Sequence, residues 1–591
     1  MIPRSRLLAG LLLVLALALA PLGAVPSRAE PGPSDRGRAV AVTPAQPMAG
    51  ERARFSGRVG AVTGRATLER KKGKRWVAVA RGKVKKGRYK LDTRVRKAGS
   101  YRVRAGRFTS KRVEVRLAPQ AAQLSTGALF VVGLPRTVTA TVTPARAGRT
   151  VRLERLDGAA WTTVGTVSTD STGQARFGYA GGPAGTTSYR VVGDAHQGAA
   201  GVVSASRSVR TAASPELASP GTAPGEESFD PSVSADGRWV AFTSGAPLLP
   251  ADSDGHDDVY LFDRVTGGLS LAVPSADSHV NSGVLSADGR FLAFQSTASN
   301  LAGEGDYDYD VFVLDRQDGS LDLVSTATGG SAPGNNDSYL YDLSDDGRVV
   351  AFTSTASDLV TLSPPPNTSV RHAYLRDRGT DTTRPLDRVG LGWSDANIFG
   401  LDLSADGSRV AFTSSDTDLD PGNVDGSAVF AWDIAANGAI SNRVNLTPDI
   451  DADSPSLSGT GDEIAVTTEA ALSLADLNGV RDTYLRTPAG SFALVGPYGA
   501  AGNPGGTLSD DGRFVSMGTK NVLPGDTNGG QADIVVWERA TGTSTLITRA
   551  GAGASGDDRL SPDGSVLVFG SAAAIVPGAT GDYDVYVQVL R

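Results

Sequence analysis

Four short acidic segments hold the residues whose types and spacing could bind a metal ion. Residues 252–258 read Asp-Ser-Asp-Gly-His-Asp-Asp and residues 476–482 read Asp-Leu-Asn-Gly-Val-Arg-Asp, while 304–310 and 526–533 carry related patterns. Oxygen atoms at the first, third and last positions can converge on a hard cation, because calcium accepts six to eight oxygen ligands in flexible geometry. The sequence therefore predicts structural calcium, with no cofactor required for function, at Asp252, Asp254, Asp258, Glu304, Asp306, Asp310, Asp476, Asn478, Asp482, Asp526, Asn528 and Asp533.

The alternative interpretation of these segments is turn formation. Asp and Asn side chains hydrogen-bond their own backbone in tight turns and need no metal to do so. The equivalent segments 367–372, 423–427 and 581–584 lack the full set of oxygen-bearing side chains. The segments also lack the bidentate Glu at position twelve of a helix-loop-helix calcium site. Both interpretations stay open at this point.

Other catalytic chemistry finds little support in the sequence. The four histidines, His196, His256, His279 and His372, do not have the spacing of a zinc site. No Gly-x-Ser-x-Gly nucleophile motif is present. We therefore expect no catalytic residues and no enzyme. Two irregular segments, 361–369 and 391–399 with Trp393, are candidates for a ligand groove, or else tolerated surface insertions.

A repeated phrase organises the chain around these segments. It is first written Ser-Ala-Asp-Gly-Arg-Trp-Val-Ala-Phe from Ser234 and returns at Ser286, Ser344, Ser404, Ser458, Ser509 and Ser561, between 51 and 60 residues apart. Asp-Gly between two apolar runs predicts a hairpin turn. The consecutive apolar residues that follow predict a strand buried on both faces. A period of this length with several strands per unit is typical of a β-propeller.

Each repeat is long enough for four strands, but the sequence ends after the third strand of the seventh repeat. The segment 209–219 precedes the first repeat and has strand character, so we predict that it pairs with the last repeat. The phrase resembles the TolB-like β-propeller repeat, and Ser-Pro-Asp-Gly at 561–564 matches it best. The resemblance covers roughly residues 214–591. It implies a β-propeller, a fold found in binding proteins and beside peptidase domains. The seven repeats predict seven blades over 213–591, with the ring closed by the N-terminal strand.

The N-terminus has the features of an export signal. Residues 1–29 combine Arg4 and Arg6, an apolar run and a small-x-small ending, and 30–38 read as a linker. The chain has no cysteine, which excludes a lipoprotein anchor and a disulfide scaffold. We expect cleavage, no transmembrane segment after signal removal, and a secreted or cell-envelope location.

Two small domains are expected between the linker and the repeats. Residues 39–117 and 119–212 share a strand, a Gly-x-x-Trp-x-x-Val run and a later Tyr-Arg-Val, with alternating polar and apolar residues. They resemble the immunoglobulin-like modules of bacterial exported proteins. The expected fold class is therefore all-β, with two small β-sandwich modules before the seven-bladed propeller.

Charge is strongly segregated. Residues 51–118 hold 24 Lys and Arg against four acids, a net charge of +20, whereas the whole chain is −5. A field of this sign favours polyanions such as wall polymers or anionic lipid head groups. The alternatives are a solvated strand surface, or docking on the acidic remainder of the same chain. Specific nucleic-acid binding is not expected, because aromatic residues for base stacking are few.

These patterns predict a secreted or cell-surface, non-catalytic binding protein. The repeats would present a recognition surface for a protein partner, and the basic module would anchor a monomeric chain to an envelope polyanion. The alternatives are a hydrolase or lyase acting on extracellular polymers, and a TolB-like scaffold between envelope proteins.

Overall fold

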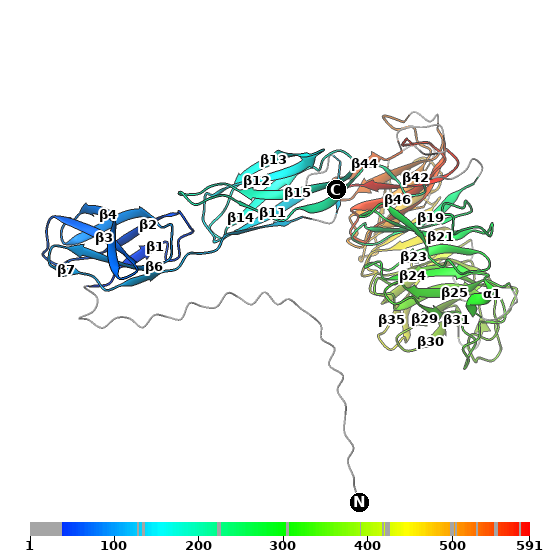
Figure 1. Ribbon diagram of the computed structural model, residues 1–591. Coiled ribbons are helices and arrows are strands. Elements are labelled where there is room, and N and C mark those ends of the chain that lie inside the picture. Colours follow the sequence, from blue (N-terminus) through cyan, green and yellow to red (C-terminus); the bar gives the residue numbers. More distant parts are fainter. Residues whose placement is uncertain are drawn as a thin grey trace, which may run out of the picture. The chain divides into compact units, whose positions relative to one another are not determined.

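The computed structural model describes residues 38–126, 129–132, 136–220, 226–302, 307–389, 392–416, 419, 426–496, 502, 505–526, 530–548, 553–577, 579 and 581–591 (Figure 1). The predicted signal peptide and residues 30–37 of the predicted linker lie outside these residues. In the described part of the chain, no helix is long and apolar enough to cross a bilayer.

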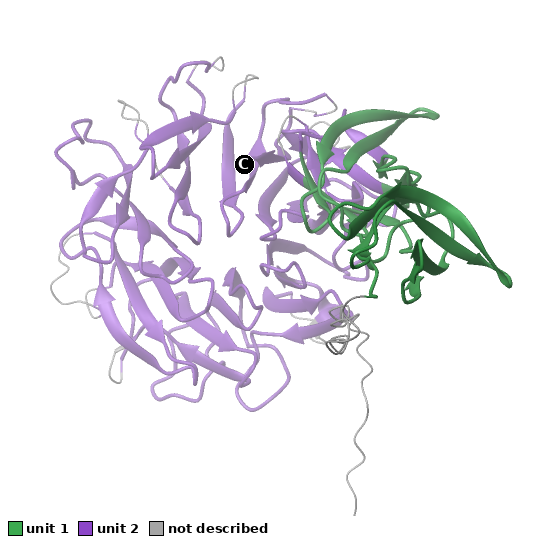
Figure 2. Cartoon of the chain, turned by 90° about the vertical axis from the view of Figure 1, so that its left-hand side faces the viewer, with its two compact units in different colours: residues 1–125, 138–177, 189–207 green, residues 126–137, 178–188, 208–591 purple. Residues whose placement is uncertain are grey.

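The chain divides into two compact units. Unit 1 comprises residues 1–125, 138–177 and 189–207, and unit 2 comprises 126–137, 178–188 and 208–591 (Figure 2). Secondary structure in the described residues is β throughout, apart from the short helix α1 (Ser299–Ala302). The all-β character predicted from the sequence is confirmed.

The first predicted module consists of two antiparallel sheets that share one core. Alternation along the strands places Phe55, Leu68, Tyr89 and Val103 inside, each 2% exposed or less, and the basic residues outside. This is the arrangement of a small β-sandwich. The sheets consist of β1 (Ala41–Thr43), β2 (Arg52–Arg58) and β5 (Arg88–Arg94), and of β3 (Arg65–Lys72), β4 (Arg75–Lys83), β6 (Gly99–Ala105), β7 (Phe108–Thr109) and β8 (Val113–Val115).

The second module repeats this plan. In both modules an Arg lies over a Trp ring and pairs with a Glu: Arg102 over Trp76 at 4.2 Å, and Arg190 over Trp161 at 4.1 Å. The shared sequence order therefore reflects a shared arrangement. Its sheets consist of β9 (Ala121–Ser125), β11 (Arg136–Thr143) and β14 (Gln174–Tyr179), and of β10 (Leu129–Val131), β12 (Thr150–Asp157), β13 (Ala160–Ser168), β15 (Gly185–Gly193), β16 (Val202–Val203) and β17 (Arg207–Ala212).

The repeats form four-stranded antiparallel sheets, one per repeat, which we number 1 to 7 in chain order. Sheets 1 to 3 consist of β19 (Ser228–Val233), β20 (Trp239–Ser244), β21 (Asp258–Asp263) and β22 (Gly268–Leu271); β23 (Val280–Leu285), β24 (Phe291–Ser296), β25 (Asp310–Asp315) and β26 (Ser320–Leu323); and β27 (Ser338–Leu343), β28 (Val349–Ser354), β29 (His372–Asp377) and β30 (Thr382–Pro385). A two-stranded ribbon follows, β31 (Arg388–Val389) and β32 (Gly392–Trp393).

Sheets 4 to 7 continue this pattern. They consist of β33 (Ile398–Leu403), β34 (Arg409–Ser414), β35 (Ala428–Ile434) and β36 (Ile440–Asn445); β37 (Ala452–Leu457), β38 (Ile464–Thr468), β39 (Asp482–Arg486) and β40 (Phe492–Leu494); β41 (Thr507–Leu508), β42 (Phe514–Thr519), β43 (Asp533–Glu538) and β44 (Thr543–Leu546); and β45 (Ser555–Leu560), β46 (Val566–Ser571) and β47 (Asp584–Val589), completed by β18 (Glu216–Leu217).

The repeated phrase folds as the predicted hairpin between the first and second strands of each sheet. In sheet 1, Asp236 accepts hydrogen bonds from the Ser234 hydroxyl (2.8 Å) and the Arg238 amide (2.9 Å), and Gly237 has φ near +64°. Only glycine adopts that conformation without steric cost. Arg238 then pairs with Asp263 at the end of the third strand. Each residue of the phrase therefore has a role within its own sheet.

The segment before the first repeat does pair with the last one, as predicted. Strand β18 lies antiparallel to β47, with Glu216 opposite Val587 and Leu217 opposite Tyr586. The buried Arg264 donates a hydrogen bond from Nε to Glu216 (3.0 Å), which ties this short strand to sheet 1 as well. Strand β19 of sheet 1 contacts β45 and β46 of sheet 7. The sheets of unit 2 stand side by side around a common centre in Figure 2.

The predicted fold class nevertheless needs correction. The hydrogen bonds of the described residues define twelve separate antiparallel or mixed sheets of two to six strands, and an all-β chain of many small sheets is the fold that they establish. The prediction of a closed seven-bladed propeller of the TolB-like type is replaced by this description. The physical reason is that the repeat phrase encodes a local hairpin, and a hairpin signal carries no information about the arrangement of the sheets that contain it.

Candidate functional site

The acidic segment of sheet 1 brings three predicted metal ligands together. One carboxylate oxygen from each of Asp252, Asp254 and Asp258 lies within 4.8 Å of the others. The segment connects β20 to β21, so Asp258 is the first residue of a strand that is buried along its whole length. Asp252 is 7% exposed and Asp258 is 5% exposed, whereas Asp254 is exposed to solvent.

Three negative charges in this position are electrostatically unfavourable without a cation. Burial, together with the nearby carboxylates of Asp252, Asp254 and Asp257, raises the pKa of Asp258 to about 7. Tyr260 donates a hydrogen bond from its hydroxyl to Asp252. The site therefore concentrates negative charge that the tyrosine hydroxyl only partly compensates.

Turn formation is also present in this segment. The backbone amide of His256 donates to Oδ1 of Asp254 at 3.0 Å, which is the local hydrogen bond of an Asx turn. This bond accounts for one oxygen of Asp254. It does not account for the burial of Asp258, which accepts no side-chain or loop hydrogen bond in the described part of the chain.

The segment of sheet 5 has a related arrangement. Tyr484 donates to Asp476, as Tyr260 does to Asp252, and the Asn478 amide group donates to Asp482 at 2.7 Å. Asn478 also accepts from the Val480 amide at 3.1 Å. An internal hydrogen bond therefore takes the place that a third carboxylate has in sheet 1.

The other two predicted segments are only partly described. Glu304, Asp306 and Asn528 lie outside the described residues. The amide of Asp526 donates to the carbonyl of Leu523 in a turn. The acids that begin the third strands have hydroxyl partners, which the sequence analysis did not find: Asp310 accepts from Ser325 at 2.7 Å, and Asp533 accepts from Thr548 at 2.6 Å.

This hydroxyl occupies one structural position that can be compared across the sheets. It follows the last hydrogen-bonded residue of the fourth strand, and in sheets 2, 4, 6 and 7 the position holds Ser325, Thr447, Thr548 and Ser219. Sheets 1 and 5 hold Val273 and Gly496 there, which offer no hydroxyl. These are the two sheets whose acidic segments have the seven-residue Asp-x-(Asp/Asn)-Gly-x-x-Asp spacing.

Sheet 3 uses a histidine at the start of its third strand. His372 Nδ1 is 2.7 Å from Oδ2 of Asp387, which takes the hydroxyl position, and both side chains are fully buried. Trp393 covers His372 at 4.8 Å between ring centroids and donates from Nε1 to the carbonyl of Pro364. This hydrogen bond brings the two irregular segments, 361–369 and 391–399, together. Trp393 is 9% exposed, so it packs inside this cluster and does not line an open groove.

A cavity of about 580 Å³ lies among the first strands of the sheets in unit 2. Asp342 and Asp402 line it, and each accepts a backbone amide of the next sheet, from Leu403 (2.8 Å) and Leu457 (2.6 Å). Their carboxylates therefore join neighbouring sheets, as the Ser232 hydroxyl does in sheet 1.

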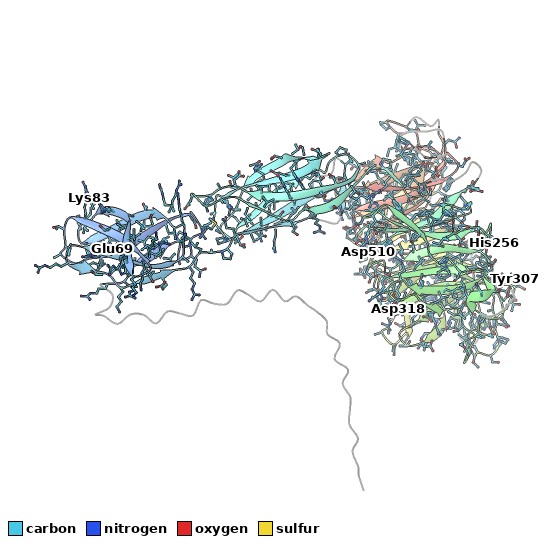
Figure 3. All side chains as sticks on the ribbon, viewed as in Figure 1. Glu69, Lys83, His256, Tyr307, Asp318 and Asp510 are labelled. Atoms are coloured by element: carbon cyan, nitrogen blue, oxygen red, sulfur yellow. The ribbon has the colours of Figure 1, made fainter. Side chains whose placement is uncertain are left out.

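Two further carboxyl groups line the same cavity. Burial and neighbouring carboxylates raise the pKa of Asp345 to about 6 and that of Asp510, labelled in Figure 3, to about 7. The residues that line the cavity include Arg559 but no histidine. The cavity thus offers acidic groups without a nucleophile–histidine pair.

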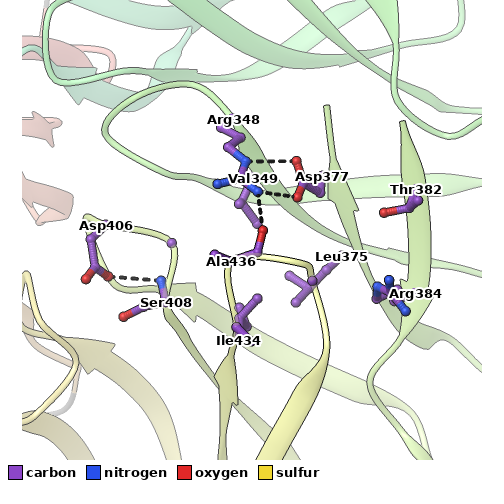
Figure 4. A pocket seen from close by; sticks show the side chains of 13 residues that line it. Arg348, Val349, Leu375, Asp377, Thr382, Arg384, Asp406, Ser408, Ile434 and Ala436 are labelled. Carbon is purple, nitrogen blue, oxygen red and sulfur yellow. Dashed lines mark hydrogen bonds and ion pairs between the residues drawn. The ribbon is translucent and has the colours of Figure 1, made fainter. Parts of the chain in front are cut away.

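A smaller pocket of about 170 Å³ lies between sheets 3 and 4 (Figure 4). Arg348 there is bound to Asp377 and to the carbonyl of Ala436, and Arg384 donates to the carbonyl of Asn437 at 3.1 Å. These cations serve the packing of the two sheets.

The basic character of residues 51–118 takes a specific form in the sandwich. Exposed cations stand directly opposite exposed cations on paired strands: Arg52 faces Arg94, Arg58 faces Arg88, Arg65 faces Lys83 and Lys72 faces Arg75. We call these eight residues the cross-strand cations; Lys83 is labelled in Figure 3. The four acids of the region are already engaged, by Arg146, Arg102, Arg54 and Ser100.

Comparison with known proteins gives no family for this chain. No family model and no curated protein matches it. Solved structures with partial likeness include a tetra-tandem repeat from the extending region of a large adhesion protein (13% identity, covering 67% of this chain and 96% of that one, TM-score 0.16) and a putative membrane anchored protein from Corynebacterium diphtheriae (9% identity, 69% and 89%, TM-score 0.17). A fragment of the ICAM-5 ectodomain is 18% identical over 40% of this chain and 74% of that one, with a TM-score of 0.14.

TM-scores in this range support no conclusion about fold or function. The predicted membership of the TolB-like family is wrong, because no family model of any kind matches the chain. The immunoglobulin-like character of the two N-terminal modules depends on their own paired sheets and shared Trp–Arg–Glu arrangement.

Proposed function

We propose that this chain is a secreted or cell-surface binding protein without catalytic activity, and that its first module binds a polyanion of the cell envelope. The observation that supports this proposal is the pairing of the cross-strand cations. Side chains directly opposite each other on antiparallel strands have Cβ atoms about 5 Å apart, and like charges in that relation destabilise the sheet.

A merely solvated surface does not account for this arrangement. Alternation along a strand explains why polar residues point outward, but acidic residues would serve solubility equally well and would relieve the repulsion. Four like-charged pairs in one small module become favourable when a polymer with closely spaced negative charges lies across them. Wall polymers rich in phosphate and anionic lipid surfaces both have this chemistry.

The C-terminal unit is assigned a binding role in this proposal. Its cavity carboxylates Asp342 and Asp402 are engaged with backbone amides, and Asp345 and Asp510 have no histidine beside them among the lining residues. A protein partner or an extracellular polymer is the class of ligand for which such a surface is suited. Export is supported by the pattern of residues 1–29.

The test is co-sedimentation of the full-length mature chain with purified cell envelopes at low and high salt. We expect the wild-type chain to pellet at low salt and to be released by high salt, because surface charge interactions are screened over about 10 Å at 0.1 M. One variant removes three cross-strand cations. It carries Arg52→Gln, Arg88→Gln and Arg94→Gln.

A matched control removes the same charge elsewhere on exposed positions. It carries Arg176→Gln, Arg207→Gln and Lys520→Gln. We expect the first variant to stay in solution and the control to pellet like the wild type. If both variants stay in solution, net charge alone determines binding to the envelope. If both pellet like the wild type, another surface binds the envelope. Either result would refute the assigned role of the first module.

A further inference from the structure

We propose that Asp252, Asp254 and Asp258 of sheet 1 bind one calcium ion that fixes the connection between β20 and β21. The first argument is geometric: one oxygen of each carboxylate lies within 4.8 Å of the others. Oxygens bound to one calcium at 2.3–2.6 Å can be no more than about 5 Å apart, and the three groups satisfy that limit.

The second argument is the isolation of Asp258. Its side chain is 5% exposed, begins a wholly buried strand and receives no side-chain or loop hydrogen bond in the described part of the chain. A buried carboxylate without a hydrogen-bond partner is costly, and proteins pair such groups or use them to coordinate metals. Asp258 points into the same cluster as Asp252 and Asp254, where a cation would be its partner.

The third argument comes from comparison among the repeats. In sheets 2 and 6 a hydroxyl satisfies the acid that begins the third strand, as Ser325 does for Asp310 and Thr548 does for Asp533. Sheet 1 has Val273 at the hydroxyl position and gains two further carboxylates instead. The cation of sheet 1 would therefore take the place that the hydroxyl has in sheets 2 and 6.

The cluster favours calcium over smaller or softer ions. All three protein ligands are carboxylates, so the donor set is hard, and the Asx turn at Asp254 leaves its second oxygen for a ligand. Magnesium demands near-ideal octahedral geometry at 2.0–2.1 Å, which three carboxylates on a short connecting segment are not arranged to supply. The remaining positions around calcium would be filled by water and backbone oxygens.

The experiment uses the full-length chain, stripped of metal with a chelator and titrated with calcium by isothermal titration calorimetry. Terbium is a second probe, because Tyr260 contacts Asp252 and can sensitise its luminescence. We expect saturable calcium binding, and weaker binding of magnesium. Asp254→Asn changes an exposed residue and should not affect folding. It should remove one equivalent of bound calcium or weaken that site at least about tenfold, because affinity follows ligand charge.

The control is Asp257→Asn in the same segment. It removes the same charge from a residue that contacts His279 and does not belong to the cluster. We expect it to retain the full number of calcium equivalents. The proposal is overturned if calcium does not bind at millimolar concentration, if Asp254→Asn and Asp257→Asn behave alike, or if Asp258→Asn keeps every equivalent of the wild type.

Discussion

Replacing Thr548 with valine removes a hydroxyl that serves two buried groups at once. Thr548 is 4% exposed, donates to Oδ1 of Asp533 at 2.6 Å and accepts from the Ile534 amide at 3.0 Å. Valine has nearly the same shape, so the packing of sheet 6 is kept and the hydrogen bonds alone are lost. The variant therefore measures how much a buried acid depends on the hydroxyl position.

The expected magnitude follows from the two bonds. A hydrogen bond to a charged group contributes about 1.5–3 kcal/mol, and a buried amide left without a partner costs about 1–3 kcal/mol. Because Asp533 has further contacts that remain, we expect a combined loss of about 3 kcal/mol. Unfolding entropy is about 2.1 cal/mol/K per residue, so for a unit of about 400 residues this loss lowers Tm by roughly 4 °C.

The assay is differential scanning calorimetry of the full-length chain in chelator, with Thr543→Val as the control. Thr543 lies on β44 of the same sheet, is exposed, and its hydroxyl faces Thr541 and water. We expect the control to change Tm by less than about 1 °C, since surface substitutions stay within about 0.5 kcal/mol. If Thr548→Val lowers Tm no more than the control does, Asp533 does not need the Thr548 hydroxyl for stability. The argument that a buried acid at the start of the third strand requires a partner would then have no energetic support.

Three further outcomes are expected. Burial raises the pKa of Asp510 to about 7, above its value in the unfolded chain, so the folded chain holds this proton more tightly. Stability in urea should therefore rise as pH falls from about 8 to 5, and Asp510→Asn should reduce that rise. Arg146→Met leaves Glu51 buried without its cation and should cost about 3–5 kcal/mol in urea denaturation; a loss below 1 kcal/mol would contradict this. Val273→Thr supplies a hydroxyl to Asp258 and should stabilise the metal-free chain by about 1–2 kcal/mol, measured as a rise in Tm in chelator.

The sequence was most informative where structure is determined by neighbouring residues. Ser234, Asp236 and Gly237 form their hairpin through contacts two or three residues apart, so the turn follows from the residue types alone. The convergence of Asp252, Asp254 and Asp258 was predictable for the same reason, because seven residues of one connecting segment hold all three carboxylates.

The hydroxyl partners and the cavity could not be predicted from the sequence, because they bring together residues that are distant in the chain. The hydroxyl partner of Asp310 lies 15 residues away, on the far side of the sheet's last hairpin, and the cavity carboxylates come from separate repeats. The family resemblance failed for a related reason. Ser-Pro-Asp-Gly at 561–564 describes a turn that many β proteins need, so the match reports the local chemistry of that turn.

The start of the third strand shows how one structural requirement is met in several ways within a single chain. That position is buried in every sheet described, since it lies between strands that are apolar on both faces. A carboxylate there needs a partner, which Thr548 provides as a hydroxyl for Asp533. In sheet 3 the position holds His372, and Asp387 satisfies it from the hydroxyl position. For sheet 1, where the hydroxyl position holds Val273, we propose a cation at Asp258. The four solutions, which include the Asn478 amide at Asp482, would give the sheets different responses to metal and pH although the repeat phrase is shared.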